Sequence, residues 1–416
     1  MLRLFLASAL LAAAAEPVEP PESWIDKDTG HRVVRLTKEQ GSASLYFNQN
    51  GYTADGKKLV YTTPDGIHVL DLATRQAKQV VQGRVRLIDA GRKTQRVFYL
   101  RDGAAFWTNV DTGETKNIAD LPKRGSIATV NADETLLGGT YIEGEGQDYN
   151  NQRPAAPAAA SAPAAQGHSL DQPRNKGQMM EDRWAARLPM GLYTLNVNTG
   201  EVKTIHRAND WLNHLLFSPT DPTMLMFCHE GPWHKVDRIW LMRTDGTMPA
   251  KKIHSRTMAM EIWGHEFWSP DGKTIWYDLQ TPRGEDFFVA GYKVDSGERT
   301  WYHLQRDEWS IHFNVTRDEK LFTGDGGDPG QVARAKDGQW IYLFRPELFP
   351  NRGLDDKSFV RPGVFRSERL VNMSKHQYRL EPNVSFTPDQ KWVVFRSNMF
   401  GDTYVFAVEV AKAESR

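Results

Sequence analysis

The sequence is poor in cysteine, with Cys228 alone among 416 residues. A single cysteine excludes an intrachain disulfide, so a scaffold held together by disulfides is ruled out. An excess of either charge is also missing, because Lys plus Arg and Asp plus Glu both number 52. A neutral chain exerts no long-range attraction on nucleic acid or on an anionic membrane, so neither partner is expected.

Long apolar runs are missing except at the N-terminus, which reads "MLRLFLASALLAAAAEPVEP". One arginine precedes an apolar run from Leu4 to about Ala14, which is too short to span a bilayer comfortably. Small residues then lead into an acidic, Pro-rich stretch. This pattern is typical of a secretory signal peptide, which we predict over residues 1–15. We therefore expect a periplasmic or secreted protein without a membrane span.

Signatures of several other enzyme classes are missing as well. The chain has no GxSxG elbow, no phosphate-binding Walker A loop, no HExxH helix and no cysteine pattern for zinc. The stretch "GDGGDPG" (324–330) has too few carboxylates for an EF-hand loop. These absences exclude the common phosphoryl-transfer, zinc-protease and serine-hydrolase patterns.

A repeated strand–turn–strand unit is the most informative feature that is present. Each copy has a short apolar strand, a turn built from Pro, Asp or Gly, and a second strand. Six clear copies and one degenerate copy lie at residues 52–63, 88–100 (degenerate), 130–141, 217–228, 267–278, 313–324 and 386–397. Several are followed by a further strand and a turn such as "DTGE" (111–114). Seven units of about four antiparallel strands predict an all-β fold, a seven-bladed β-propeller over residues 25–416.

Two long spacings between the repeats predict loops. The first holds a Pro/Ala-rich insertion near 145–180, which we expect to be disordered, and the second spans 346–363. The strand at 31–37 is expected to join the last blade and close the ring. An antiparallel sandwich with a helical domain is the alternative, but no long helical periodicity supports it.

Polar residues recur where the predicted blades begin. The set comprises His214, His229, His234, His265, Glu266, His312, Asp325, Asp328, His376, Tyr378, Glu381 and Asn383. His214 lies three residues before Phe217, His265 two before Phe267 and Asn383 three before Phe386. Equivalent positions in a propeller lie at similar heights around the axis, so these side chains are expected to meet at the channel mouth.

The stretch "MLMFCHEGPWHKVDRIWLM" (224–242) concentrates titratable residues after an apolar strand. The Gly-Pro that follows Glu230 forces a turn, which would hold His229 at a strand end. Glu230, Lys235, Asp237 and Arg238 could instead form a solvated hairpin with surface ion pairs of little energetic weight.

At "LLFSPTDPTMLMFCHEGPWHKVDRIWLM", "GHEFWSPDG", "GDGG" and "FTPDQKWVVFRSN", the sequence resembles the oligogalacturonate lyases. The resemblance implies a seven-bladed propeller that cleaves pectin-derived uronides by β-elimination, with a divalent metal, usually Mn²⁺, at the channel mouth. A cation on the uronate carboxylate stabilises the charge that develops when the C5 proton leaves. Imidazole suits the base because its pKa is near neutral.

The resemblance also implies roles for individual residues. His229 takes the position of the base and His265 that of a metal ligand. The family's pattern "Q-x-x-H-x-H-P-S-F-T-P" is replaced here by "YRLEPNVSFTP", so Tyr378, Glu381 and Asn383 stand where a Gln and two His are expected. His265, Glu381 and Asn383 could still hold Mn²⁺ or Ca²⁺. Alternatively, no metal binds and Tyr378 or His376 contributes directly as a proton donor or carboxylate clamp.

Other residues are candidates for substrate binding. Arg187 and Arg183 suit a uronate carboxylate, although both could be surface charge beside the insertion. Further candidates for the pocket wall are His214, His234, Arg238, His312 and His376. Two other functions stay open: a non-catalytic binding propeller, and a glycoside hydrolase that uses two of Glu230, Glu266, Asp325 and Glu381.

Overall fold

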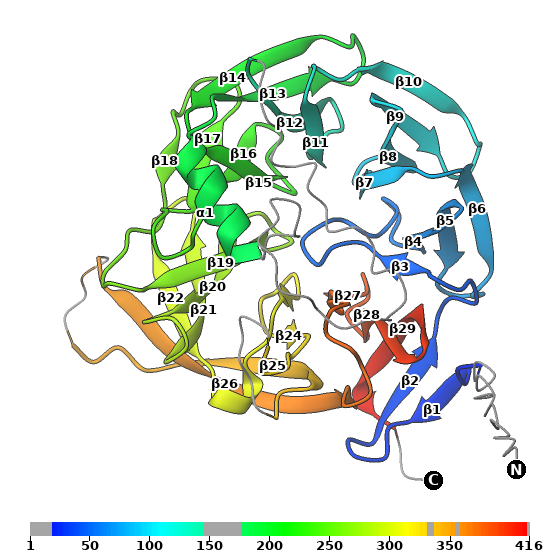
Figure 1. Ribbon diagram of the computed structural model, residues 1–416. Helices are drawn as coiled ribbons and strands as arrows, with labels where there is room; N and C mark the ends of the chain where they lie inside the picture. The colour runs from blue at the N-terminus through cyan, green and yellow to red at the C-terminus, as the bar shows by residue number, and fades with distance from the viewer. Residues whose placement is uncertain (1–18, 145–175, 331–336, 354–355, 357, 414–416) are drawn as a thin grey trace, which may run out of the picture.

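The computed structural model describes residues 19–144, 176–330, 337–353, 356 and 358–413. The predicted signal peptide over residues 1–15 and most of the insertion predicted near 145–180 lie outside these residues. Within them nearly all regular elements are strands, arranged as a ring of sheets around a central axis (Figure 1). The predicted seven-bladed propeller is confirmed.

Each blade is an antiparallel sheet whose strands follow one another along the chain from the axis outward. Blade I holds β3 (Ala43–Ser44), β4 (Lys58–Thr63), β5 (Gly66–Asp71) and β6 (Ala77–Gln82). Blade II holds β7 (Arg86–Ala90), β8 (Arg96–Arg101), β9 (Ala104–Asn109) and β10 (Thr115–Asp120). Blade III holds β11 (Gly125–Val130), β12 (Leu136–Ile142), β13 (Met190–Asn196) and β14 (Val202–Ala208).

The next blades repeat this plan. Blade IV holds β15 (Trp211–Phe217), β16 (Met224–Glu230), β17 (Ile239–Arg243) and β18 (Lys251–Lys252). Blade V holds β19 (Ile262–Trp268), β20 (Thr274–Gln280), β21 (Phe287–Lys293) and β22 (Arg299–His303), followed by the 3₁₀ turn η1 (Arg306–Glu308). Blade VI holds β23 (Phe313–Val315), β24 (Phe322–Gly324), β25 (Trp340–Leu348) and β26 (Val360–Asn372).

Blade VII closes the ring by combining both ends of the chain. It holds β27 (Ser385–Phe386), β28 (Trp392–Phe400) and β29 (Asp402–Lys412), to which β2 (His31–Arg35) and then β1 (Ser23–Ile25) are added. The register of β2 on β29 pairs Val33 with Val408 and Val34 with Ala407. The prediction that the strand near 31–37 joins the last blade is confirmed.

Blades V and VI are also joined, because β26 runs parallel to β22 at their outer edges.

The second long loop, predicted over residues 346–363, is shorter than predicted. Residues 346–348 belong to β25 and residues 360–363 to β26. Their strand partners supply the backbone hydrogen bonds that a loop would have lacked.

The core lies between neighbouring blades rather than in one centre. Met226 and Leu241 of blade IV, for example, pack in one buried cluster with Trp263 and Tyr277 of blade V. Apolar side chains on both faces of a strand produce this stacking, since each sheet is covered on both sides.

A helix that the sequence did not predict, α1 (Lys176–Ala186), lies over the inner ends of blades IV and V (Figure 1). Its first residues fall at the end of the range near 145–180 that was expected to be disordered. Trp184 of α1 packs on Gly231, where an added Cβ would lie 3.2 Å from Trp184 Cδ1 and 2.8 Å from Val236 Cγ1. Glycine therefore permits the close approach of α1 to the loop after β16.

Four polar residues occupy one equivalent position along the innermost strands of blades IV to VII. His214, His265, His312 and Asn383 each lie three residues before the last residue of β15, β19, β23 and β27. Three of them adopt the left-handed conformation, with φ of 47° at His214, 48° at His265 and 54° at Asn383. The register of β15 and of β19 shifts there, as at a β-bulge. The predicted equivalence of these positions is confirmed, with Trp268 rather than Phe267 as the counterpart of Phe217.

Candidate active site at the channel mouth

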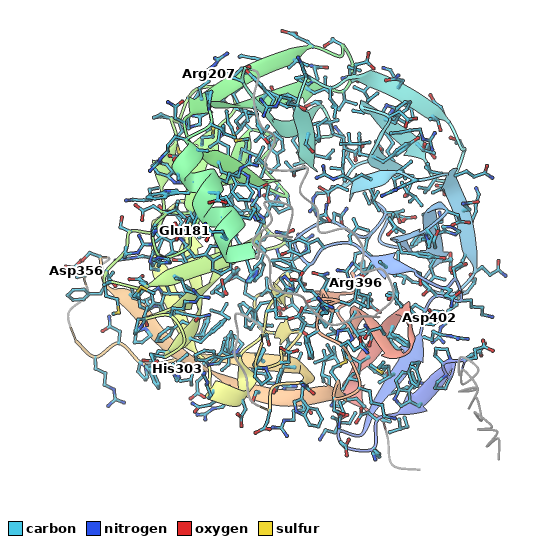
Figure 2. All side chains as sticks on the ribbon, viewed as in Figure 1. Glu181, Arg207, His303, Asp356, Arg396 and Asp402 are labelled. Carbon is cyan, nitrogen blue, oxygen red and sulfur yellow. The ribbon has the colours of Figure 1, made fainter. Side chains whose placement is uncertain are left out.

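A cavity of about 770 Å³ opens at the ends of the inner strands, between α1 and blades IV to VII. Its polar and aromatic lining comprises Glu181, Trp233, His234, His265, Arg283, Arg306 and Glu381. Glu181 projects from α1, which forms one wall (Figure 2). Concave sites of this size with a few convergent polar groups are the usual place for ligand binding.

His265 is fixed in the cavity wall by a buried carboxylate. Its Nδ1 lies 3.2 Å from Oδ2 of Asp278, on the neighbouring strand β20. Burial disfavours the imidazolium, but the Asp278 charge, together with Glu381 and Glu266, outweighs it and raises the pKa of His265. The bond at Nδ1 leaves Nε2 of His265 as the atom available to a ligand.

His312 is held in the same way in the next blade. Its Nδ1 lies 2.8 Å from Asp325 Oδ2, and its Nε2 lies 3.0 Å from the Tyr46 hydroxyl and 3.8 Å from Glu381 Oε2. Its ring packs edge-on against His265, with centroids 4.9 Å apart. His312 is fully buried. The predicted meeting of histidines from different blades is therefore observed for this pair.

Asn383 and Glu381 place oxygen atoms beside these histidines. Oδ1 of Asn383 is buried and has no hydrogen-bond partner among the described residues, while its Nδ2 donates to the Glu381 carbonyl. Arg396, on the inner side of the ring (Figure 2), donates from Nε to the same carbonyl at 2.8 Å. The Glu381 carboxylate is partly exposed in the cavity.

Three donors of this group suit a hard divalent cation. They are Nε2 of His265, the Glu381 carboxylate and the unpartnered Oδ1 of Asn383. A buried amide oxygen without a partner loses hydration, and a cation would compensate it. The His265–Asp278 bond matches the carboxylate that commonly orients a metal-ligating histidine. No cluster of three or more His, Cys, Asp or Glu that could hold a metal occurs in the described part of the chain. Any site here therefore depends on the amide oxygen.

His214 stands beside the cavity with one carboxylate partner. Its Nε2 lies 2.8 Å from Glu230 Oε2, and its side chain is 36% exposed whereas that of Glu230 is 4% exposed. Glu230 Oε1 also accepts from Trp233 Nε1 at 3.3 Å. Because Trp233 lines the cavity and packs edge-on to His265, this network adjoins the cavity.

Arg238 lies beneath this network and is not free to bind a ligand. Its side chain is 1% exposed; it donates from Nη1 to Glu230 at 2.5 Å and from Nε to Glu266 at 2.9 Å. Burial opposes ionisation of all three groups. The opposite charges outweigh it, lowering the pKa of both carboxyl groups and raising that of Arg238. The prediction that Arg238 contacts substrate in the pocket wall is therefore wrong, because Arg238 belongs to a buried ion-pair network. The alternative of a solvated hairpin is excluded for Glu230 and Arg238.

His229, the expected base, points away from the cavity. Alternation along β16 places Glu230 on the side of blade V, whereas the His229 ring stacks on Trp240 and lies near Phe227. Its Nδ1 lies 3.2 Å from Asp210 Oδ2, and its buried Nε2 has no partner among the described residues. Burial lowers the pKa of His229 despite the Asp210 charge. The structure does not bring this imidazole to the other site residues.

Tyr378 and His376 are buried in the base of blade VII. The Tyr378 hydroxyl donates to the Asp325 carbonyl at 3.1 Å, and burial raises its pKa. His376 binds Ser397 Oγ through Nδ1 at 2.9 Å and the Leu380 carbonyl through Nε2 at 2.6 Å. These bonds commit both side chains to the protein interior, so neither is placed to donate a proton or clamp a carboxylate.

The remaining predicted binding residues divide between the cavity and α1. His234 lines the cavity. Arg187 pairs with Asp210 and lies over the Trp184 ring, and Arg183 is buried over the Trp211 ring at 4.1 Å. Both arginines thus attach α1 to blade IV. Lys235, in turn, pairs with Glu181 of α1 at 2.8 Å.

Two cavity residues were missed at the sequence level, Arg283 and Arg306. Both are exposed in the cavity wall beside His265. Arg306 donates to the Gly284 carbonyl at 2.7 Å and lies over the Trp309 ring. They come from the loop after β20 and from η1, which lie outside the recurrent positions of the inner strands, so the repeat gave no signal for them.

The carboxylates needed by a hydrolase are mostly engaged. Glu230 and Glu266 bind Arg238, and Asp325 binds His312 together with the backbone amides of Ile311 and His312. Glu381 alone among the four candidates lines the cavity. A pair of acidic groups facing one another across the cavity is not formed by these four residues.

A family model described as oligogalacturonate lyase matches residues 177–414, more than half of the chain. The chain belongs to the oligogalacturonate lyase family. An oligogalacturonate lyase of Dickeya dadantii (strain 3937) is 26% identical over 408 residues, covering 93% of this chain and 95% of that protein. An oligogalacturonide lyase of Pectobacterium atrosepticum is 25% identical with the same coverage.

Solved structures of oligogalacturonate lyases share the fold. An oligogalacturonate lyase in complex with manganese superposes with a TM-score of 0.72 at 24% identity, covering 94% of this chain and 96% of that one. An oligogalacturonate lyase from Vibrio parahaemolyticus gives a TM-score of 0.72 at 23% identity, covering 95% and 97%. The predicted family and the predicted class, a carbon–oxygen lyase acting on polysaccharides, are confirmed. No helix in the described residues is long and apolar enough to cross a membrane.

Proposed function

We propose that this oligogalacturonate lyase family member cleaves pectin-derived oligogalacturonides by β-elimination at the channel mouth, giving an unsaturated uronate. The main support for this proposal is the His214–Glu230 pair, a partly exposed imidazole held by a buried carboxylate beside a cavity lined by two arginines. A uronate has an acidic hydrogen at C5, next to its carboxylate, and a leaving oxygen at C4. Base, anion site and cavity together match this substrate.

We assign the base to His214. Its Nε2–H donates to Glu230, so Nδ1 keeps the lone pair that can accept the C5 proton. The C–H electron pair then forms the C4–C5 double bond, the C4–O bond breaks, and the leaving oxygen takes a proton from solvent. Glu230 stabilises the imidazolium that forms, and Arg238 fixes the position of Glu230.

Arg283 and Arg306 are the proposed carboxylate-binding residues. Guanidinium groups pair with carboxylates through two parallel hydrogen bonds, which orients a sugar as well as attracting it. A chain of uronates carries one carboxylate per residue, so two arginines in one wall suit neighbouring sugars. Trp233 adds an aromatic surface against which an apolar sugar face can pack.

His265, Glu381 and Asn383 are the residues that would hold a divalent cation. Nitrogen and oxygen donors of this kind accept Mn²⁺, and Ca²⁺ is the alternative. The oligogalacturonate lyase solved in complex with manganese supports Mn²⁺ for this fold. Once bound, the cation would neutralise the substrate carboxylate and so make the C5 hydrogen more acidic.

Incubation with a panel of uronides and neutral oligosaccharides tests the function. We expect oligogalacturonides to raise the ultraviolet absorbance of the unsaturated uronate, and neutral galactosides to give no change. Release of reducing sugar without that absorbance would indicate hydrolysis instead. Binding without any cleavage would support the non-catalytic propeller.

We also propose export to the periplasm or the medium, on the basis of the apolar N-terminal run. N-terminal sequencing of the protein recovered from the periplasmic fraction tests this. A mature chain that begins near residue 16 is expected, and an uncleaved cytoplasmic chain would contradict it.

A further inference from the structure

A second cavity, of about 390 Å³, opens at the other end of the axial channel. It is lined by the turns that follow the inner strands, with contributions from all seven blades, including Thr53, Arg92, Val130, Pro219, Pro270, Arg317 and Pro388. It shares no lining residue with the cavity that contains His265. The two cavities are therefore separate sites at opposite ends of the inner strands.

One position of the repeat sets the character of this second cavity. This position lies in the turn, two residues after the last paired residue of each inner strand. From blade I to blade VII, it is occupied by Ala54, Arg92, Ala132, Pro219, Pro270, Arg317 and Pro388. Five of the seven residues are small or rigid and uncharged. Only blades II and VI carry a long cationic side chain, and these blades face each other across the ring (Figure 1).

Arg92 and Arg317 reach the same space without a protein partner. Both are solvent-accessible through the cavity, and neither forms a hydrogen bond or ion pair with any described residue. The surrounding protein lowers the pKa of Arg92; Asp89 opposes this, whereas the nearby Arg317 charge adds to it. Two guanidinium groups that sense each other across a protein-walled cavity repel, and an anion between them would remove the repulsion.

Asp89 does not neutralise the pair fully. This carboxyl group is 5% exposed and accepts a hydrogen bond from the backbone N–H of Asn50 at 2.7 Å. The bond holds Asp89 in the wall between blades I and II. Burial raises its pKa to about 7, in spite of Arg92. Two arginines and one aspartate are the charged residues of the cavity lining, so its formal charge is positive even when Asp89 is ionised.

We propose that this second cavity binds a small anion, held through a carboxylate or phosphate group between Arg92 and Arg317. Guanidinium groups bind both kinds of oxyanion through paired N–H donors. The prolines and Trp268 give the wall a rigid, partly apolar surface suited to a compact ligand such as a sugar acid. A free galacturonate and inorganic phosphate are two sources of the same chemistry, and titration separates them.

Isothermal titration calorimetry with galacturonate, inorganic phosphate and neutral galactose tests the proposal. The protein carries Arg283→Gln and Arg306→Gln, so that binding in the first cavity is reduced. We expect one or both anions to bind and galactose to give no heat. Adding Arg92→Gln and Arg317→Gln should weaken anion binding at least tenfold, whereas Arg84→Gln, a matched charge change outside the cavity, should leave it unchanged.

Equal anion affinity with and without Arg92 and Arg317 would overturn the proposal, as would absence of binding by both anions at tens of millimolar. Circular dichroism of each variant shows whether it is folded. Activity does not enter this measurement, so its outcome is independent of the proposed β-elimination. Arg92→Gln and Arg317→Gln alone should retain wild-type lyase activity, because they lie outside the first cavity.

Discussion

Nε2 of His214 lies 2.8 Å from Oε2 of Glu230, and Oε1 of the same carboxylate accepts a hydrogen bond from Nη1 of Arg238. This geometry fixes the tautomer of an imidazole that is open to solvent. A neutral histidine with its proton directed at a buried carboxylate has its second nitrogen ready to accept a proton. Among the predicted histidines, His229 and His376 lack this combination of exposure and orientation.

Removing either cavity arginine should weaken substrate binding more than it slows chemistry. For Arg283→Gln and Arg306→Gln we expect KM for trigalacturonate to rise about tenfold or more, because a charge-assisted hydrogen bond contributes roughly 1.5–3 kcal/mol. Arg84→Gln is the control outside the cavity. Steady-state kinetics at low and high salt measures the effect, and an unchanged KM in both variants would refute the assigned role.

The cation site should depend on Glu381 and Asn383. We expect Glu381→Gln and Asn383→Leu each to weaken Mn²⁺ binding at least tenfold in calorimetry. The first removes the negative charge and one of the two carboxylate oxygens, and the second removes the amide oxygen. Glu181→Gln is the matched control, because this carboxylate lines the same cavity but pairs with Lys235. Equal Mn²⁺ affinity in all variants would show that the ion binds elsewhere. Chelator-insensitive activity would exclude a catalytic ion.

Arg238 should matter for folding rather than for substrate contact. Arg238→Met leaves Glu230 and Glu266 buried without their cation, and breaking such a pair costs roughly 3–5 kcal/mol. We expect a lower midpoint in urea unfolding at neutral pH. Replacing all three residues together with apolar ones should recover much of that loss. A stable Arg238→Met variant with only a raised KM would instead return this residue to the substrate site.

His376 should make stability fall in mild acid. Burial lowers its pKa to about 4 from an ordinary value of 6.5, so the unfolded chain binds a proton that the folded chain does not. The free energy of unfolding from this group should therefore decline as the pH falls from about 6.5 to about 4, by roughly 3 kcal/mol in total. Urea unfolding of His376→Gln and wild type at pH 7.5 and pH 5 measures the difference. An identical pH dependence would contradict it.

The ring of blades was predictable because its signal is repeated. Each strand–turn–strand copy carries the same turn residues, so an error in one copy, such as the degenerate 88–100, is corrected by the others. The closure by β2 followed from the same count. Helix α1 escaped prediction because it follows a Pro/Ala-rich stretch, and its large apolar residues, Met179, Met180 and Trp184, are too few to give a clear helical period.

The site was predictable only in part. The repeat predicted that His214, His265, His312 and Asn383 occupy equivalent positions in neighbouring blades, and the structure has them three residues before the end of each inner strand. The sequence did not show which face of β16 turns toward blade V, so it could not tell that Glu230, rather than His229, belongs to the network beside the cavity. A shift of one residue reverses the face of a side chain on a strand. Arg283 and Arg306 belong to loops, whose course no repeat fixes.

The rate of uronide cleavage by two single variants, His214→Gln and His229→Gln, tests whether His214 is the base. Absorbance of the unsaturated uronate formed from trigalacturonate gives kcat for each, and thermal melts confirm that both are folded. We predict that His214→Gln loses a factor of about 10²–10⁴ in kcat, as expected for removal of a general base, while His229→Gln stays within about threefold of wild type. A His214→Gln variant with nearly wild-type activity, or an inactive but folded His229→Gln variant, would show that His214 is not the base.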